Sequence, residues 1–181
     1  MSWLPNMLNN EDYEDFSHFF DVVKEVFKRD FDPRTLPRFQ GRRLALKRHP
    51  MTDGLPSTFW HFVTEGAVES ERTIELSRCR RIPWPRAILV NSTQVHCWQE
   101  VKSTKKGKAK RVLLALPDFS YLFILDDRDD YLLPWTAYPV EYNNQRRRLE
   151  KRWKKSTAPP RKDAGAAPNE GNGPVTPSTA W

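Results

Sequence analysis

The chain has 181 residues, 29% of them charged, and its 30 Lys and Arg against 23 Asp and Glu give a formal net charge of +7. That length suits one domain, no apolar run approaches the ~20 residues that cross a bilayer, and two cysteines, Cys79 and Cys97, exclude a disulfide framework. The composition therefore predicts a protein with no membrane contact and no signal peptide, in a reducing, cytoplasmic compartment, whose positive charge favours an anionic partner.

The first half of the chain carries one strong helical pattern and several weaker signals. Apolar residues recur at spacings of three and four over residues 12–29, which predicts an amphipathic helix. Residues 38–46 are predicted to form a strand. Residues 58–66 are rich in aromatic and β-branched side chains and fit either a strand or a short helix. Residues 68–81 are predicted to be a charged surface stretch.

The second half of the chain changes to a β pattern. Residues 87–90 fit a strand or a short helix, and residues 102–110 are predicted to be a basic hairpin loop. The strands are predicted at residues 95–101, 111–116, 119–125 and 131–138. A basic helix over residues 141–155 is predicted to close the folded part.

We therefore predict one domain over residues 1–156 with an α+β fold, in which N-terminal helices pack on a roughly four-stranded antiparallel meander before the closing basic helix. Residues 157–181 are rich in Pro, Ala, Gly and Asn. Such a segment cannot bury enough apolar surface to offset the entropy lost on ordering, so we predict a disordered C-terminal tail. The sequence carries no signal of the oligomeric state.

Metal, nucleotide and serine-hydrolase chemistry lack their usual motifs. The four histidines are scattered, and none has a second His or Cys at a spacing that suits a metal site. No Gly-rich phosphate loop, dinucleotide fingerprint or Gly-x-Ser-x-Gly turn occurs in the chain. The sequence therefore predicts no cofactor and no bound metal.

Three residues are candidates for proton transfer or orientation. His61 lies among large apolar residues and is either a core histidine or a group at a cleft edge that titrates near neutrality as a general acid or base. Thr136 and Tyr138 share one side of a predicted strand. They are either packing residues or hydroxyls that orient a substrate.

Cations supply the candidate phosphate contacts. Arg78, Arg81 and Arg86 flank a proline-framed turn that contains Trp84. This turn is either solvated or aims guanidinium groups at a phosphate while Trp84 stacks on a base. Two basic runs, 102–111 and 146–155, are either solvated surfaces or nucleic-acid contacts. Their candidate RNA-binding residues are Lys105, Lys106, Arg147 and Arg148.

The order of these segments resembles that of a known family. Residues 58–63 (Thr-Phe-Trp-His-Phe-Val) precede Arg-Cys-Arg-Arg-Ile-Pro-Trp at 78–84, then Phe-Ser-Tyr-Leu-Phe-Ile-Leu at 119–125, and then Pro-Trp-Thr-Ala-Tyr at 134–138 with the basic helix after it. The series, over roughly residues 12–155, resembles the phage-associated branch of the barnase–EndoU–colicin–RelE (BECR) superfamily of small metal-independent ribonucleases.

The resemblance implies an endoribonuclease that uses the RNA 2′-hydroxyl as its nucleophile and leaves a 2′,3′-cyclic phosphate. The catalytic residues it implies are His61, Arg78, Arg81, Thr136 and Tyr138. It also implies a toxin or a phage-related defence protein that acts on RNA and is held by a proteinaceous inhibitor or antitoxin. Two alternatives from the residues themselves are a non-catalytic, basic nucleic-acid-binding module and an adaptor whose basic helix binds an acidic partner.

Overall fold

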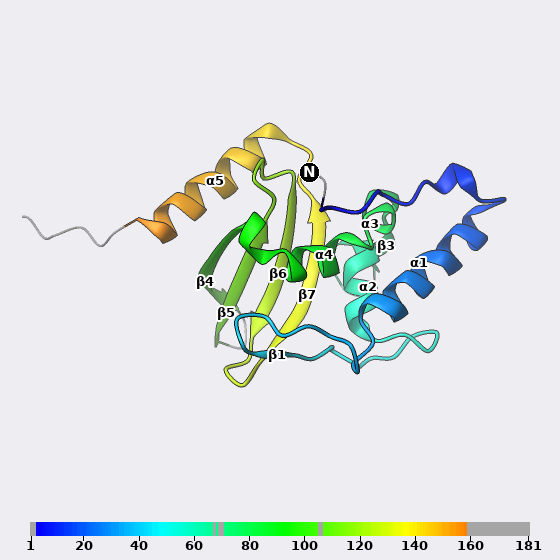
Figure 1. The fold of residues 1–181 in the computed structure, drawn as a ribbon, viewed down its shortest axis with the longest axis horizontal. Coiled ribbons are helices and arrows are strands. Elements are labelled where there is room, and N and C mark those ends of the chain that lie inside the picture. The colour runs from blue at the N-terminus through cyan, green and yellow to red at the C-terminus, as the bar shows by residue number, and fades with distance from the viewer. Residues whose placement is uncertain (1–2, 67, 69–70, 105–106, 159–181) are drawn as a thin grey trace, which may run out of the picture.

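The computed structural model describes residues 3–66, 68, 71–104 and 107–158 (Figure 1). These residues confirm the α+β class, with helices beside a five-stranded, mostly antiparallel sheet. No helix of this described part is long and apolar enough to span a membrane. Lys105, Lys106 and residues 159–181 of the predicted tail lie outside the described residues.

Several of the helices are short, and most of them precede the main strands in the chain. They are η1 (Asn10–Asp12), α1 (Phe16–Asp30), α2 (Ser57–Val63), α3 (Leu76–Arg80), α4 (Trp84–Val90), η3 (Ser92–Gln94) and α5 (Asn143–Thr157). The amphipathic helix predicted over 12–29 is present as α1. It begins at Phe16 because the Asp15 side chain accepts the backbone N–H of His18 at 2.8 Å and so caps the helix.

The two ambiguous apolar segments are helices. The aromatic segment forms α2, and the segment after Pro83 forms α4, with Pro85 in the first turn, where no backbone N–H is needed. The charged stretch predicted over 68–81 lies mostly at the surface among the described residues, but its last part forms α3, which buries Cys79. Glu75 starts α3 by accepting the backbone N–H groups of Ser77 and Arg78.

The main sheet has the strand order β1-β7-β6-β5-β4. The strands are β1 (Arg43–Leu44), β4 (His96–Thr104), β5 (Gly107–Ala115), β6 (Tyr121–Asp127) and β7 (Tyr131–Pro139), and β2 (Thr64–Glu65) pairs with β3 (Thr73–Ile74) in a small second sheet. Consecutive strands from β4 to β7 pair antiparallel, whereas β1 pairs parallel to β7. Among the described residues the main sheet therefore has five strands, one more than the roughly four predicted, and the added strand is the parallel β1.

Two predicted segments differ from the structure. The strand predicted over 38–46 shrinks to β1, because Phe39 and Arg42 close a tight turn in which Gln40 and Gly41 have φ of 50° and 77°. The basic loop predicted over 102–110 is wrong, because β4 and β5 continue to pair as far as Thr104 and Gly107. Basic side chains on an exposed hairpin do not prevent ladder formation.

The two faces of the main sheet have different cover. One face packs against the helices α1 to α4 (Figure 1) through a large apolar core that includes Phe19, Phe59, Phe62, Val112, Leu114, Phe123 and Leu125. We call the other one the open face. It bears Trp98, Leu113, Leu122, Ile124 and Tyr138, and α5 covers one end of it with Leu149 and Trp153.

Candidate active site

The open face is hollowed beside α5. The hollow has a volume of about 280 Å³ and is lined by Glu100, Val101, Lys102, Arg111, Leu113, Leu122, Ile124, Tyr138 and Arg152. Its apolar floor comes from β5 and β6, and its charged groups come from β4, β5 and α5. We call it the Tyr138 hollow, because Tyr138 stands where it meets a second hollow beside α3 that Arg78 also lines.

Three arginines from three elements act on the Tyr138 hydroxyl through their charge. The Arg78 guanidinium lies over the tyrosine ring, 5.2 Å from its centroid. Burial of Tyr138 raises the pKa of its hydroxyl, while the positive charges of Arg152, Arg78 and Arg111 act in the opposite direction. The hydroxyl is thus protonated at neutral pH, in a field that favours negative charge.

A carboxylate completes the charged lining of the hollow. Glu100 accepts hydrogen bonds from Trp98 Nε1 at 2.7 Å and from Arg152 Nε at 2.8 Å. Burial alone would raise the pKa of Glu100, but the bonds from Arg152 and Trp98 outweigh it, and the pKa lies below its ordinary value. Glu100 is therefore an anion fixed in the hollow by its two donors.

Arg78 and Arg111 are held in place by partners that do not use all of their hydrogen-bond donors. Arg78 donates one hydrogen bond, to the Thr64 carbonyl at 2.8 Å, and burial followed by the nearby charge of Arg72 lowers its pKa. Arg111 faces Asp126 with 3.6 Å between Nε and Oδ1, which is an ion pair but too long for a hydrogen bond. A guanidinium has five N–H donors, so both cations keep donors for an anion.

The structure places His61 outside the lining of this hollow. The imidazole is 7% exposed and stacks on Trp135, with 4.8 Å between ring centroids. It lines a separate hollow of about 490 Å³ with Trp60, Thr64 and Arg72, among others. Thr136 is tied to the same helix, because its hydroxyl donates to the His61 carbonyl at 3.0 Å.

The other residues of the predicted arginine turn lie on the helical side of the sheet. Arg81 donates to the Ser77 carbonyl and lies over the Trp84 ring, 5.2 Å from its centroid. Trp84 donates to the Pro5 carbonyl and packs edge-on against Tyr121, which belongs to the large core. The structure thus brings Arg78 to Tyr138 but leaves Arg81 and Trp84 outside the lining of the Tyr138 hollow.

The fourth member of that turn has a structural partner. Arg86 donates to the carbonyls of Asp30 and Thr35, at 2.7 and 3.1 Å. These bonds satisfy backbone acceptors at the end of α1 and in the loop after it. Its guanidinium is therefore engaged with the main chain and lies apart from the hollow.

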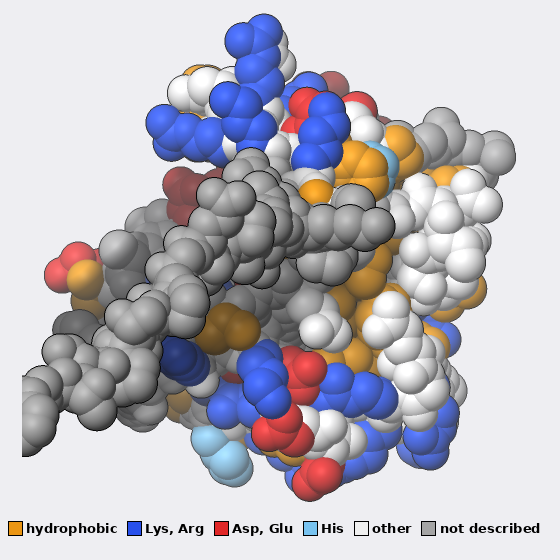
Figure 2. Space-filling model, turned by 90° about the vertical axis from the view of Figure 1, so that its left-hand side faces the viewer, with side chains coloured by type: hydrophobic (Ala, Val, Ile, Leu, Met, Phe, Trp, Pro, Cys, Tyr) orange, Lys and Arg blue, Asp and Glu red, His pale blue; other side chains and the backbone are white. Residues whose placement is uncertain are grey.

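The closing helix α5 forms a basic ridge. Figure 2 shows Lys and Arg side chains gathered at the top of the molecule, where α5 lies in Figure 1. Arg147 and Arg148 are both exposed. At about 100° per residue, Arg148 lies within a turn of Arg152 on the flank beside the hollow, whereas Arg147 lies on the side of the helix away from the buried Leu149.

Sequence reasoning missed Glu100, Arg111 and Arg152 as members of the site. The signal was present, since Trp98, Glu100 and Lys102 alternate on one side of β4 and Glu100 pairs directly with Arg111 across the ladder. Glu100 and Arg111 both lie within predicted strands, and what the sequence did not supply was the register that sets them opposite each other. Only the docking of α5 on the sheet brings Arg152 to Glu100.

No protein-family model, curated protein or solved structure matches the chain. The fold and the site define an α+β protein with a cationic, carboxylate-bearing hollow on the open face of its sheet. Within the described ranges, no three His, Cys, Asp or Glu side chains gather as ligands for a metal ion.

Proposed function

We propose that the chain is a metal-independent endoribonuclease whose active site is the Tyr138 hollow. The observation that carries the proposal is that Arg111, Arg152 and Glu100 line one hollow with Tyr138, whose ring lies under the Arg78 guanidinium. Three cations suit a phosphodiester, and a fixed carboxylate beside a protonated hydroxyl suits proton transfer. The resemblance to BECR ribonucleases supports the same reading, with consecutive strands β4 to β7 as its meander and α5 as its closing basic helix.

In the proposed reaction the RNA supplies the nucleophile. Glu100 accepts the proton of the 2′-hydroxyl as that oxygen forms a bond to phosphorus. Tyr138 donates its proton to the 5′-oxygen as the P–O5′ bond breaks, which yields a 2′,3′-cyclic phosphate and a 5′-hydroxyl. The three arginines contact the phosphate oxygens and stabilise the charge that develops on them and on the tyrosinate. Proton return from Glu100 to Tyr138 through water restores the enzyme.

This proposal shifts proton transfer from His61 to the pair of Glu100 and Tyr138. His61 then acts as a positioning residue, because it packs on Trp135, whose ring also lies 5.7 Å from the Arg111 guanidinium. Trp135 belongs to β7, the strand that also carries Tyr138. The proposal includes the role implied by the resemblance, a cytoplasmic toxin or phage-defence protein under the control of a protein inhibitor.

Cleavage of a single-stranded RNA in excess EDTA tests the proposal. Tyr138→Phe keeps the ring under Arg78 and removes only the hydroxyl, so we expect turnover to fall about 10²–10⁴-fold while the melting temperature is unchanged. Tyr131→Phe, at the other end of β7, is the matched control. A 2′-deoxy substitution at the cleaved nucleotide should abolish cleavage there. Activity that needs a divalent metal, or that survives in Tyr138→Phe, would contradict the proposed mechanism.

A non-catalytic RNA-binding module is the second candidate. It is favoured by the hydrogen bonds that already join Arg152 and Glu100 and by the cations of α5, which need no catalytic group to hold a phosphate backbone. The same assay separates the two candidates. A binding module retards RNA on a native gel and leaves every strand intact, with or without EDTA.

A further inference from the structure

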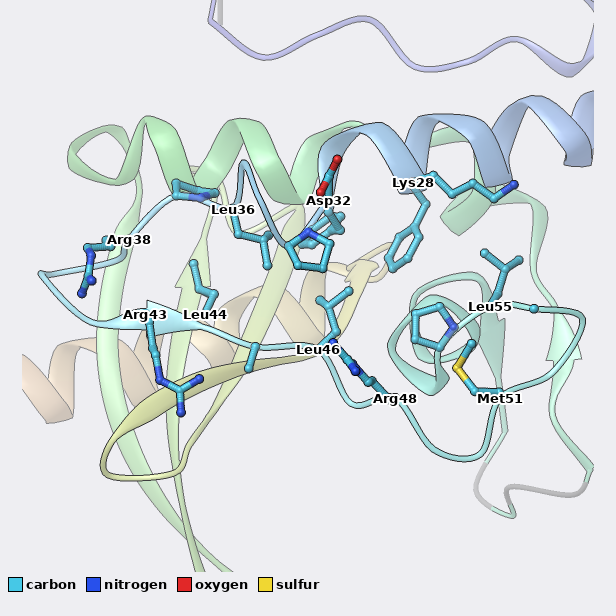
Figure 3. Close-up of a pocket in the computed structure, with 17 residues that line it drawn as sticks. Lys28, Asp32, Leu36, Arg38, Arg43, Leu44, Leu46, Arg48, Met51 and Leu55 are labelled. Atoms are coloured by element: carbon cyan, nitrogen blue, oxygen red, sulfur yellow. The ribbon is translucent and has the colours of Figure 1, made fainter.

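A second and larger hollow lies away from the proposed active site. It has a volume of about 880 Å³ and lies between the end of α1, the loop after α1, β1 and the loop before α2 (Figure 3). None of its lining residues lines the Tyr138 hollow. Along β7, from Tyr131 beside β1 to Tyr138, the separation is roughly 23 Å at about 3.3 Å per residue. We call this second hollow the basic groove.

The floor of the basic groove is apolar. Phe27, Phe31, Leu44 and Leu55 contribute buried side chains to its lining. Leu36 and Leu46 are half-buried beside them, and Met51 is 48% exposed at the end of the groove near Leu55 (Figure 3). The exposed part of this floor would be released from water if a partner's apolar side chains covered it.

The lining of the basic groove is strongly cationic. Its described residues include Lys28, Arg38, Arg43 and Arg48 but only one acid, Asp32. The negative charge of Asp32 is already paired, because the Arg34 guanidinium donates three hydrogen bonds to the carboxylate and lowers its pKa to about 2.

Among the residues that the structure describes, three of the cations have no carboxylate partner. Lys28 pairs with Glu25, but Arg38 donates to the Gly41 carbonyl and Arg43 lies over the Tyr131 ring, 4.7 Å from its centroid. Within the described part of the chain, no carboxylate forms an ion pair with Arg38, Arg43 or Arg48. These guanidinium groups therefore remain able to bind carboxylates from outside.

We propose that the basic groove binds a short acidic segment of a partner protein that carries large apolar side chains. The apolar floor takes the hydrophobic side chains, and Arg38, Arg43 and Arg48 take the carboxylates. Seventeen residues line the groove, fewer than the 20–30 on each side of a standard interface, so the occupant is a segment rather than a whole domain face. The inference does not depend on the proposed ribonuclease activity.

The shape of the floor favours a protein segment over RNA. Nucleic acid without base pairing is held on exposed aromatic faces that stack on bases. Here the aromatic rings of Phe27 and Phe31 stack on each other, with 5.1 Å between centroids, and each is 2% exposed. The accessible floor is aliphatic and suits Leu or Phe side chains from a partner.

Fluorescence anisotropy with a labelled peptide tests the inference. The probe is a synthetic decapeptide of sequence Glu-Asp-Leu-Glu-Asp-Phe-Glu-Asp-Leu-Glu, and one comparison peptide has Ser in place of Leu and Phe. We expect Arg48→Glu to weaken binding roughly tenfold or more, because a charge-assisted contact becomes a repulsion. Met51→Asp should weaken it as strongly. The matched control is Arg147→Glu on α5, which should change binding less than about twofold, by screened long-range charge alone.

The outcomes decide the inference separately from the ribonuclease proposal. Equal losses of peptide affinity in Arg48→Glu and Arg147→Glu would show general charge attraction. Equal affinity for the Ser-containing peptide and for the original probe would show that the apolar floor makes no contact with the peptide. Either result overturns the inference. Loss of RNA binding rather than peptide binding in Arg48→Glu would assign the groove to nucleic acid, and loss of a self-associated state in that variant would assign it to a second copy. Tyr138→Phe, which tests the ribonuclease, should bind the peptide like wild type.

Discussion

Replacing Arg152 by Ala separates the role of the Tyr138 hollow from that of general positive charge. In the folded protein Arg152 pairs with Glu100, and the two side chains are 48% and 28% exposed. An ion pair so open to solvent contributes only about 0.2–1 kcal/mol to the free energy of unfolding. The variant should therefore fold and melt close to wild type.

RNA binding should respond much more strongly than stability. A hydrogen bond from a guanidinium to a phosphate contributes about 1.5–3 kcal/mol, which corresponds to a loss of about 10- to 150-fold in affinity. Loss of one phosphate contact should also make the slope of log K against log salt concentration, measured with single-stranded RNA, shallower by about 0.7. The measurement is fluorescence anisotropy over a salt series, with a labelled RNA whose 2′-hydroxyls are methylated so that no strand is cut.

The control for this prediction lies on the same helix. Arg147→Ala removes an identical charge from the side of α5 that faces away from the sheet, so it should weaken binding by a few-fold at most. Equal losses in affinity and in salt slope for Arg147→Ala and Arg152→Ala would refute the reasoning. The phosphate would then be held by the ridge of α5 as a whole and not by the hollow.

Three further predictions concern the supports of the site. The pKa of Glu100 is lower in the folded protein than in the unfolded chain, so its contribution to stability is complete above about pH 4.3 and is lost as the pH falls through the folded pKa. The difference in unfolding free energy between wild type and Glu100→Gln, measured by urea unfolding, should therefore shrink between pH 7 and pH 3. A difference that stays constant would contradict the ion pair of Glu100 with Arg152. Leu149→Ala removes a side chain that is 5% exposed under α5 and should cost about 2 kcal/mol, or roughly 4–8 °C in melting temperature; no change would mean that α5 is not docked. His61→Ala should lower the melting temperature through lost packing on Trp135 but keep most turnover per folded molecule, whereas a loss of about 10²-fold or more with an unchanged melting temperature would return proton transfer to His61.

The parts of the fold with long periodic patterns could be predicted from the sequence. The helix α1 and the strands β6 and β7 could be predicted from the spacing of their apolar residues. The helix buries one face, and each of the two strands contains a run of consecutive buried residues. The short helices α2 and α4 could not be assigned, since seven residues complete only about two turns and show no clear period. Tertiary packing of their aromatic and aliphatic side chains decides their conformation.

The site was predictable only where its residues lie on recognisable elements. Arg78 and Tyr138 were identified as candidates, yet their contact depends on α3 packing beside the end of β7. Arg86 shows the reverse case. In the sequence it resembles a phosphate ligand, but its guanidinium satisfies two carbonyls after α1, and no local pattern distinguishes a cation that binds backbone from one that binds a substrate.

The three arginines whose charge acts on Tyr138 each have a different anchor. Arg78 is fixed by the Thr64 carbonyl, Arg111 by Asp126 and Arg152 by Glu100. Because the anchors are separate, each guanidinium keeps N–H groups that its anchor does not use. Burial, and after it the nearby charge of Arg72, lowers the pKa of Arg78, so an anion beside Arg78 would stabilise its charged form. In the proposed ribonuclease, the phosphodiester of the RNA would supply that anion.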